Sequence, residues 1–171
     1  MEINKEELAR FSITRMDGYF NVSNVKASLL ITTNAVIMGT SVTSYLSLID
    51  NVSLPSVIPY IKFGLSLTVI LAIISTVFSL QVIFSYLKSG SRTLKYHSLI
   101  FFGSISQLDE ETYIEEFSKA SDEDHLNDIL RQVYVLSRGL ESKFKNVNRS
   151  VVFSGLSILM LAISGMLIYW G

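Results

Sequence analysis

Three long uncharged runs dominate the pattern of hydrophobic and polar positions along the chain. They cover residues 27–49, 63–87 and 150–171, and are 23, 25 and 22 residues long. At a rise of about 1.5 Å per residue, a helix of any of these lengths exceeds the roughly 30 Å hydrocarbon core of a bilayer. The pattern therefore predicts three transmembrane helices, because the polar remainder of the chain is too short to cover three such runs in a soluble core.

Between the second and third runs the pattern changes to amphipathic helices. Asp109, followed by two glutamates, predicts the start of a short helix that ends near Ala120, and Ser121 predicts the start of the next helix. Apolar residues then recur at helical spacing without an intervening proline, which predicts one helix of about 45 residues that continues into the third run. The second run is expected to continue to about His97, with a break at residues 102–104.

The predicted fold is an all-α membrane protein. Its three transmembrane helices carry a cytoplasmic helical module, which is formed partly by extensions of the second and third helices. Apolar side chains interleaved with charges before residue 27 predict an interfacial or docking helix ahead of the membrane. The predicted segments are the N-terminal segment 1–26, helix 27–49, external loop 50–62, helix 63–87, sensor module 88–149 and helix 150–171.

Basic residues lie almost entirely on one side of the predicted membrane. Thirteen of the 14 Lys and Arg residues fall before residue 27 or between residues 88 and 149, and Lys62 is the exception. The positive-inside rule therefore predicts a multi-pass protein whose N-terminus and module are cytoplasmic and whose C-terminus is outside. Tyr169 and Trp170 are expected at the outer interface, where aromatic side chains are enriched.

Composition and motifs argue against catalysis. Only 17% of the residues are charged, there is no cysteine, and the net charge is −1. The chain contains no glycine-rich phosphate loop, no His-Glu-x-x-His motif and no Gly-x-Ser-x-Gly motif. The acidic run from residue 109 to residue 128 is interpreted as a solvated helix start rather than a divalent metal site, because its carboxylates are sequential. We therefore expect no enzyme activity, no catalytic residue, no metal, no cofactor and no nucleic-acid polymer as partner.

Small residues form faces on the predicted membrane helices. Gly64, Thr68, Ala72, Ser75 and Ser79 share one stripe of the second helix. The third helix has a stripe of Gly155, Ala162 and Gly165, and Asn34 is the most polar residue at membrane depth. Such faces permit close helix packing, either within one chain or between copies. We therefore expect the chain to lie in a lipid bilayer and to associate with further copies of itself as a homo-oligomer.

Three segments carry a family resemblance. They are residues 24–30, 101–113 and 128–137, the last leading to Lys143 and Phe144, and they occur in the same order among the hydrophobic runs. On these segments the chain resembles the transmembrane effectors of bacterial Pycsar antiphage defence. One position departs from the family pattern, because Asn24 stands where the family often has aspartate.

The resemblance implies a ligand and an output. A partner cyclase would make a cyclic pyrimidine mononucleotide, the module would bind it, and the membrane part would damage the bacterial inner membrane. Arginine and lysine suit a phosphate, and aromatic rings can stack on a base. The implied ligand-binding residues at motif positions are Phe102, Gln107, Gln132, Tyr134 and Lys143. Arg131 and Arg138 are further candidates because of their positive charge alone.

Two other functions stay open on the sequence. The module could be the docking face of a membrane-anchored interaction subunit. Alternatively, the chain could form a small holin-like pore without a nucleotide ligand. A nucleotide cyclase encoded beside this chain would separate the gated effector from both.

Overall fold

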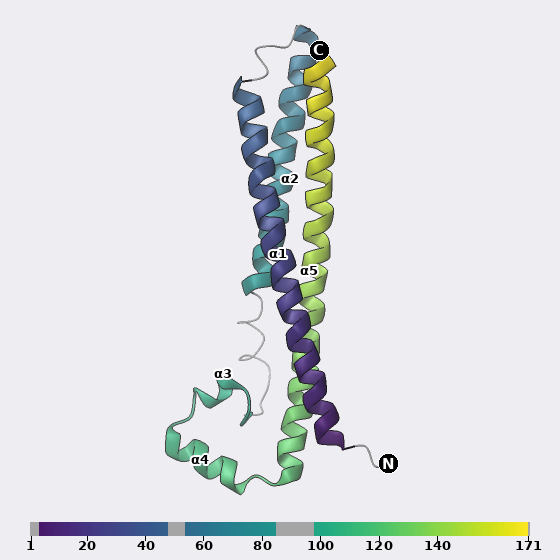
Figure 1. Cartoon of the computed structure of the whole chain (residues 1–171). Coiled ribbons are helices and arrows are strands. Elements are labelled where there is room, and N and C mark those ends of the chain that lie inside the picture. Colours follow the sequence, from purple (N-terminus) through teal and green to yellow (C-terminus); the bar gives the residue numbers. More distant parts are fainter. Residues whose placement is uncertain (1–3, 48–53, 85–97, 171) are drawn as a thin grey trace. The chain divides into compact units, whose positions relative to one another are not determined.

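The computed structural model describes residues 4–47, 54–84 and 98–170, and its regular elements in these ranges are helical (Figure 1). The absence of strands from this part of the chain confirms the predicted all-α fold. The elements in chain order are α1 (Lys5–Ser47), the 3-10 helix η2 (Pro55–Val57), α2 (Ile58–Phe84), α3 (Phe102–Ile105), α4 (Glu110–Lys119) and α5 (Asp122–Trp170).

Three of these helices confirm a multi-pass membrane protein. α1, the segment Pro55–Phe84 and α5 contain 43, 30 and 49 residues and have mean hydropathies of 1.3, 2.4 and 2.3. Each is long and apolar enough to cross a bilayer. Helices of 43 and 49 residues are about twice the length that a membrane requires, so α1 and α5 each include a long stretch outside the hydrocarbon core.

The chain divides into two compact units. One contains Met1–Val22 and Phe84–Lys143, and we call it the α4 unit. The other contains Ser23–Ile83 and Phe144–Gly171, and we call it the membrane bundle. α1 and α5 each contribute residues to both units, as unbroken helices.

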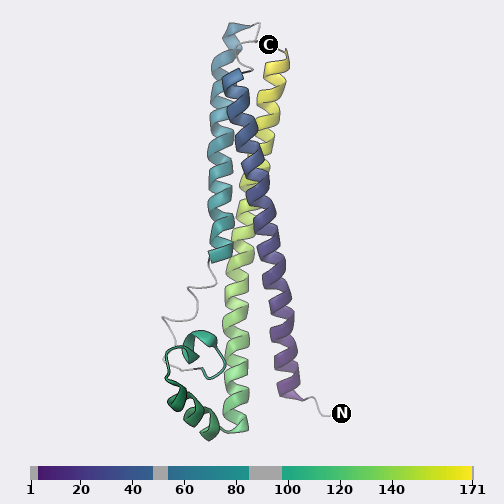
Figure 2. The same cartoon turned by 60° about the vertical axis from the view of Figure 1, so that its left-hand side comes forward.

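Hydrogen-bonded polar side chains hold the three helices of the membrane bundle together, where α2 runs antiparallel to α1 and α5 (Figures 1 and 2). The fully buried Asn34 donates to the Ser75 hydroxyl at 2.8 Å and accepts from the Ser154 hydroxyl at 3.0 Å. The hydroxyl of Ser150 lies 2.9 Å from that of Ser75 and 2.7 Å from that of Ser79. Such bonds stabilise membrane helix pairs by roughly 0.6 kcal/mol each, so this network links all three helices.

The small-residue faces have two different surroundings. The stripe of α2 that includes Gly64 and Thr68 is buried in the bundle, which supports its interpretation as packing within one chain. By contrast, Gly155 and Gly165 of α5 have no atom within 4 Å of an added Cβ. This glycine face therefore packs against nothing else in the described part of the chain.

Both predicted N-caps in the α4 unit are present. Asp109 accepts hydrogen bonds from the Thr112 N–H at 2.9 Å and the Thr112 hydroxyl at 2.7 Å, and these bonds hold the pKa of Asp109 below its usual value. Ser121 accepts from the Asp124 N–H at 3.2 Å, and Asp124 accepts from the Ser121 hydroxyl at 2.6 Å and from its N–H at 3.0 Å. The Ser121 hydroxyl is the main reason that the pKa of Asp124 is lowered. α4 and α5 therefore begin where the sequence predicts.

The uninterrupted α5 confirms the prediction of one long helix. The N-terminal segment and residues 102–104 differ in detail from the sequence prediction. The N-terminal docking helix is present as the first part of α1 and is continuous with the first membrane helix. The expected break at residues 102–104 is instead the single turn α3, which is closed by N–H bonds from Ser104 and Ser106 to carbonyl groups. The extension of the second helix to His97 lies outside the described residues.

Candidate functional site in the α4 unit

A cavity of about 440 Å³ lies within the α4 unit, and we call it the α4 pocket. The beginning of α1, the segment before α3, the helix α4 and the beginning of α5 all contribute to it. Its volume falls in the range of about 300–1,000 Å³ that is typical of small-molecule sites. The lining residues are Glu6, Arg10, Ile13, Thr14, Ile100, Phe117, Asp122, His125 and Ile129.

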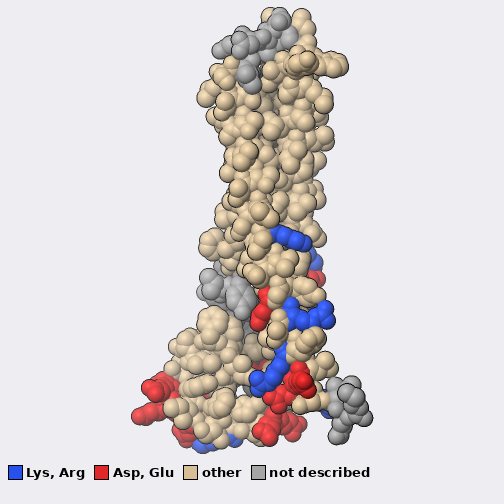
Figure 3. Space-filling model, in the orientation of Figure 1, with Lys and Arg blue, Asp and Glu red and all other residues tan. Residues whose placement is uncertain are grey.

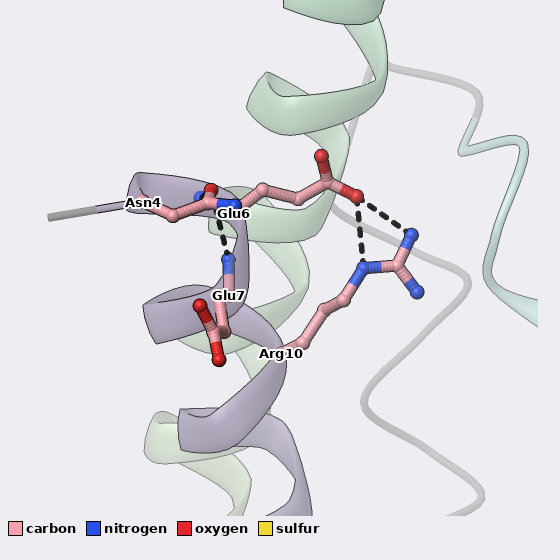
Figure 4. A network of polar contacts seen from close by, with 4 residues as sticks. All are labelled: Asn4, Glu6, Glu7 and Arg10. Carbon is pink, nitrogen blue, oxygen red and sulfur yellow. Dashed lines mark hydrogen bonds and ion pairs between the residues drawn. The ribbon is translucent and has the colours of Figure 1, made fainter.

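The first turns of α1 place an arginine in the pocket wall. Asn4 caps the helix, and its side-chain oxygen accepts hydrogen bonds from the N–H groups of Glu6 and Glu7 at 3.1 and 3.3 Å (Figure 4). One oxygen of Glu6 then accepts from Arg10 Nε at 2.9 Å and pairs with its Nη2 at 2.8 Å. The two side chains are 51% and 69% exposed. An exposed pair of this kind stabilises a protein by about 1 kcal/mol or less. An anion that binds the Arg10 guanidinium more strongly can therefore displace Glu6 from it.

α4 and α5 supply aromatic surface to the same cavity. The rings of Phe117 and His125 have their centroids 4.7 Å apart and an interplanar angle of 44°. Tyr113 extends this cluster one turn along α4, with its ring centroid 5.9 Å from that of Phe117. The buried Ile129, which is 4% exposed, adds apolar surface to the same lining. This side of the pocket suits a flat heteroaromatic ring.

Carboxylates also belong to the lining. Glu6 and Asp122 bring two negative charges against the one guanidinium of Arg10, and Figure 3 shows acidic side chains gathered where α4 lies. Carboxylates accept hydrogen bonds from hydroxyl and amino groups. The pocket can therefore bind a ligand that combines an anionic group with hydrogen-bond donors.

A buried clamp fixes the chain segment that brings Ile100 to the pocket. Asp128 is 2% exposed, and its Oδ2 accepts from the Ser98 hydroxyl at 3.0 Å and the Leu99 N–H at 2.9 Å. The Ser98 oxygen in turn accepts from the Ile100 N–H at 3.2 Å and from Gln132 Nε2 at 2.9 Å. Among the described residues, Asp128 Oδ1 has no hydrogen-bond partner. The clamp joins the segment before α3 to α5 and so shapes one wall of the pocket.

None of the seven ligand-binding residues expected from the sequence lines the α4 pocket, and two of them, Gln132 and Lys143, are at least partly buried in the α4 unit. Gln132 belongs to the clamp on Ser98. Lys143 is 2% exposed and has its Nζ 5.5 Å from the centroid of the Phe20 ring. Both side chains therefore help to pack α5 in the α4 unit.

The other five are exposed and are not gathered in this cavity. Phe102 is 60% exposed, and its ring makes a tilted contact with that of its neighbour Phe101, with centroids 4.8 Å apart and an interplanar angle of 52°. Gln107 is exposed just after α3. The remaining three lie on exposed positions of α5, namely Arg131, Tyr134 and Arg138. Their assignment to a ligand stays a prediction.

Sequence reasoning overlooked the residues that do line the cavity. Phe117 and His125 stand in no motif that predicts a ligand contact. Arg10 lies about a hundred positions before both, so no local motif joins the three. The interleaved charges and apolar residues at the start of α1 were the one available signal, because they predicted that this segment docks.

We expect the buried Lys143 to make stability depend on pH. Burial lowers the pKa of its ammonium group below the ordinary value of 10.5, so the unfolded chain holds this proton more tightly than the folded chain. Stability should therefore rise with pH between the lowered folded pKa and 10.5. Thermal unfolding of the detergent-solubilised chain should show this rise, and Lys143→Met should remove it. The exposed neighbour offers a matched control, Lys145→Met, and an equal loss of slope in that variant would contradict the assignment.

Comparison with known protein families identifies the family to which this chain belongs. The family model of the Pycsar effector protein domain matches residues 8–170 of the 171-residue chain. The chain belongs to the Pycsar effector family. The match spans both units and every lining residue of the α4 pocket except Glu6.

Membership of the Pycsar effector family confirms the resemblance and supports a role as an antiphage effector. The family is one of membrane effectors and is not a known enzyme family. No curated protein and no solved structure shows a significant match to the chain.

Proposed function

We propose that this effector binds a cyclic pyrimidine mononucleotide, made by a partner cyclase, in the α4 pocket and then disrupts the bacterial inner membrane. The observation that supports the site is the composition of one cavity. A guanidinium, an aromatic pair and two carboxylates line a space of about 440 Å³. Those groups match the phosphate, the base and the hydroxyl of such a nucleotide.

Each part of the ligand has a partner in the pocket. The phosphodiester takes the Arg10 guanidinium, whose planar fork of donors suits phosphate oxygens. The pyrimidine ring stacks on the Phe117 and His125 rings, a type of contact that contributes roughly 1–3 kcal/mol per base. The ribose 2′-hydroxyl, which a 3′,5′-cyclic phosphate leaves free, donates to Asp122. Because Arg10 must leave Glu6 to bind phosphate, Glu6 acts as the competitor that the ligand displaces.

Helix continuity supports the coupling to the membrane. α1 and α5 both line the pocket near their N-terminal ends, and both continue unbroken into the residues of the membrane bundle. A ligand that alters the contacts among α1, α4 and α5 therefore acts on two of the three membrane helices. It shifts the protein toward the disruptive state only if it binds that state more tightly, and a shift from 1% to 99% needs roughly a 10⁴-fold difference in affinity.

Calorimetric titration of the full chain in nanodiscs tests the ligand assignment. We expect cyclic CMP or cyclic UMP to bind more tightly than cyclic AMP, because the proposal assigns the aromatic pair to a pyrimidine base. Linear 5′-UMP should bind more weakly than its cyclic form, because its second phosphate charge faces the two carboxylates. Absence of binding by every cyclic nucleotide would contradict the proposal and would favour a docking subunit.

A further inference from the structure

A second cavity, of about 310 Å³, opens on the membrane bundle between α1 and α2, and we call it the bundle groove. Its lining is almost entirely apolar. Val42, Leu46 and Ile70 are 50%, 70% and 53% exposed, so the groove faces outward from the bundle rather than into it. In a bilayer this surface meets lipid.

A single cation lies beside the groove. The Nζ of Lys62 is 5.8 Å from the centroid of the Tyr45 ring, and Tyr45 lines the groove. Lys62 is the only Lys or Arg between Lys26 and Lys88. It is exposed and makes no ion pair with the described residues. The bundle groove therefore combines an apolar lining with one positive charge and one aromatic ring beside it.

We propose that the bundle groove binds one anionic phospholipid. An acyl chain lies along the groove, and the phosphate binds the Lys62 ammonium. Tyr45 lies at the boundary between chain and headgroup, where tyrosine is favoured. This occupant fills the groove with one ordered acyl chain and brings an anion to a cation that has no ion-pair partner among the described residues.

A second copy of the chain complements the charge less well. Its three uncharged runs contain no carboxylate, so the membrane-spanning part of a second copy offers Lys62 no anion, and Asp50 is the one carboxylate in the sequence between residues 27 and 88. The phosphate of a lipid meets that charge at the depth where headgroups already lie. The charge beside the groove therefore favours lipid over a protein partner.

Native mass spectrometry of the purified full chain tests the proposal without any nucleotide. Titration with phosphatidylglycerol and phosphatidylcholine should show tighter binding of the anionic lipid. Lys62→Gln should weaken phosphatidylglycerol binding about fivefold. It should weaken phosphatidylcholine binding less, because the choline ammonium already neutralises the phosphate of that lipid. Lys145→Gln, a matched change outside the groove, should alter neither.

The variant Val42→Trp distinguishes lipid binding in the groove from non-specific attraction of anionic lipid to positive charges. Its indole fills the cavity from an exposed position, so the variant should fold and should lose binding of both lipids. Equal binding by wild type, Lys62→Gln and Val42→Trp would overturn the proposal. Efficient disulfide linkage of two chains through Val42→Cys in nanodiscs would also overturn it, because it would show that a second copy fills the groove.

Discussion

Replacing Arg10 with alanine should weaken binding of a cyclic pyrimidine mononucleotide about 10- to 150-fold. A hydrogen bond to a charged group contributes about 1.5–3 kcal/mol, and each 1.4 kcal/mol is a factor of ten in affinity. Stability should change little, because the ion pair that Arg10 makes with Glu6 is exposed. Calorimetric titration of nanodisc-embedded wild type and variant measures the difference directly.

Three further variants make this result specific. Lys5→Ala removes a positive charge from the same helix start without touching the pocket lining, so it should leave affinity unchanged. Glu6→Gln should bind the nucleotide up to about fivefold more tightly, because the competitor for Arg10 is gone. Arg138→Ala tests the exposed face of α5. If that variant loses affinity and Arg10→Ala does not, the ligand binds at the sequence-predicted residues instead of the α4 pocket.

Replacing Gly64 with leucine should unfold or mispack the membrane bundle. A Cβ added at this buried glycine of α2 would clash with the Ser164 hydroxyl of α5 and lie 3.7 Å from its Cβ. Forcing a large side chain into a packed interface costs about 1–3 kcal/mol, and sometimes more. We expect a clearly lowered unfolding temperature in detergent, together with loss of any membrane-disrupting activity.

Gly155→Leu is the matched control on α5. An added Cβ there meets nothing within 4 Å, so the single chain should keep its unfolding temperature. If copies associate through this glycine face, cross-linking in nanodiscs should fall in Gly155→Leu while stability stays normal. Equal destabilisation by both substitutions would show that the two glycines have the same surroundings, against the packing described above.

The fold was predictable because its signals are local. Three uncharged runs define the membrane helices, and the caps Asp109 and Ser121 define the starts of α4 and α5. Each signal depends on residues within about one helical turn of one another. The continuity of α1 was harder to predict, because charges at Arg15 and Asp17 suggested a separate interfacial helix. Docking of that segment within the α4 unit outweighs its polar sequence.

The candidate site was not predictable in the same way, because three separate parts of the chain assemble it. Arg10, Phe117 and His125 meet only after α1 packs against α4 and α5. Resemblance to a family motif also does not distinguish a ligand contact from a packing contact. Successive side chains on a helix point about 100° apart, so Gln132 of α5 turns toward Ser98 while neighbouring Arg131 is exposed.

The most direct test of the gated-effector account is dye release from proteoliposomes that contain the full chain. Added cyclic CMP or cyclic UMP should release the dye from wild-type vesicles. Arg10→Ala should require about 10- to 150-fold more ligand for the same release. Release without any nucleotide would indicate a constitutive, holin-like pore. No release from vesicles in which calorimetry detects bound ligand would contradict the coupling of the α4 pocket to the membrane.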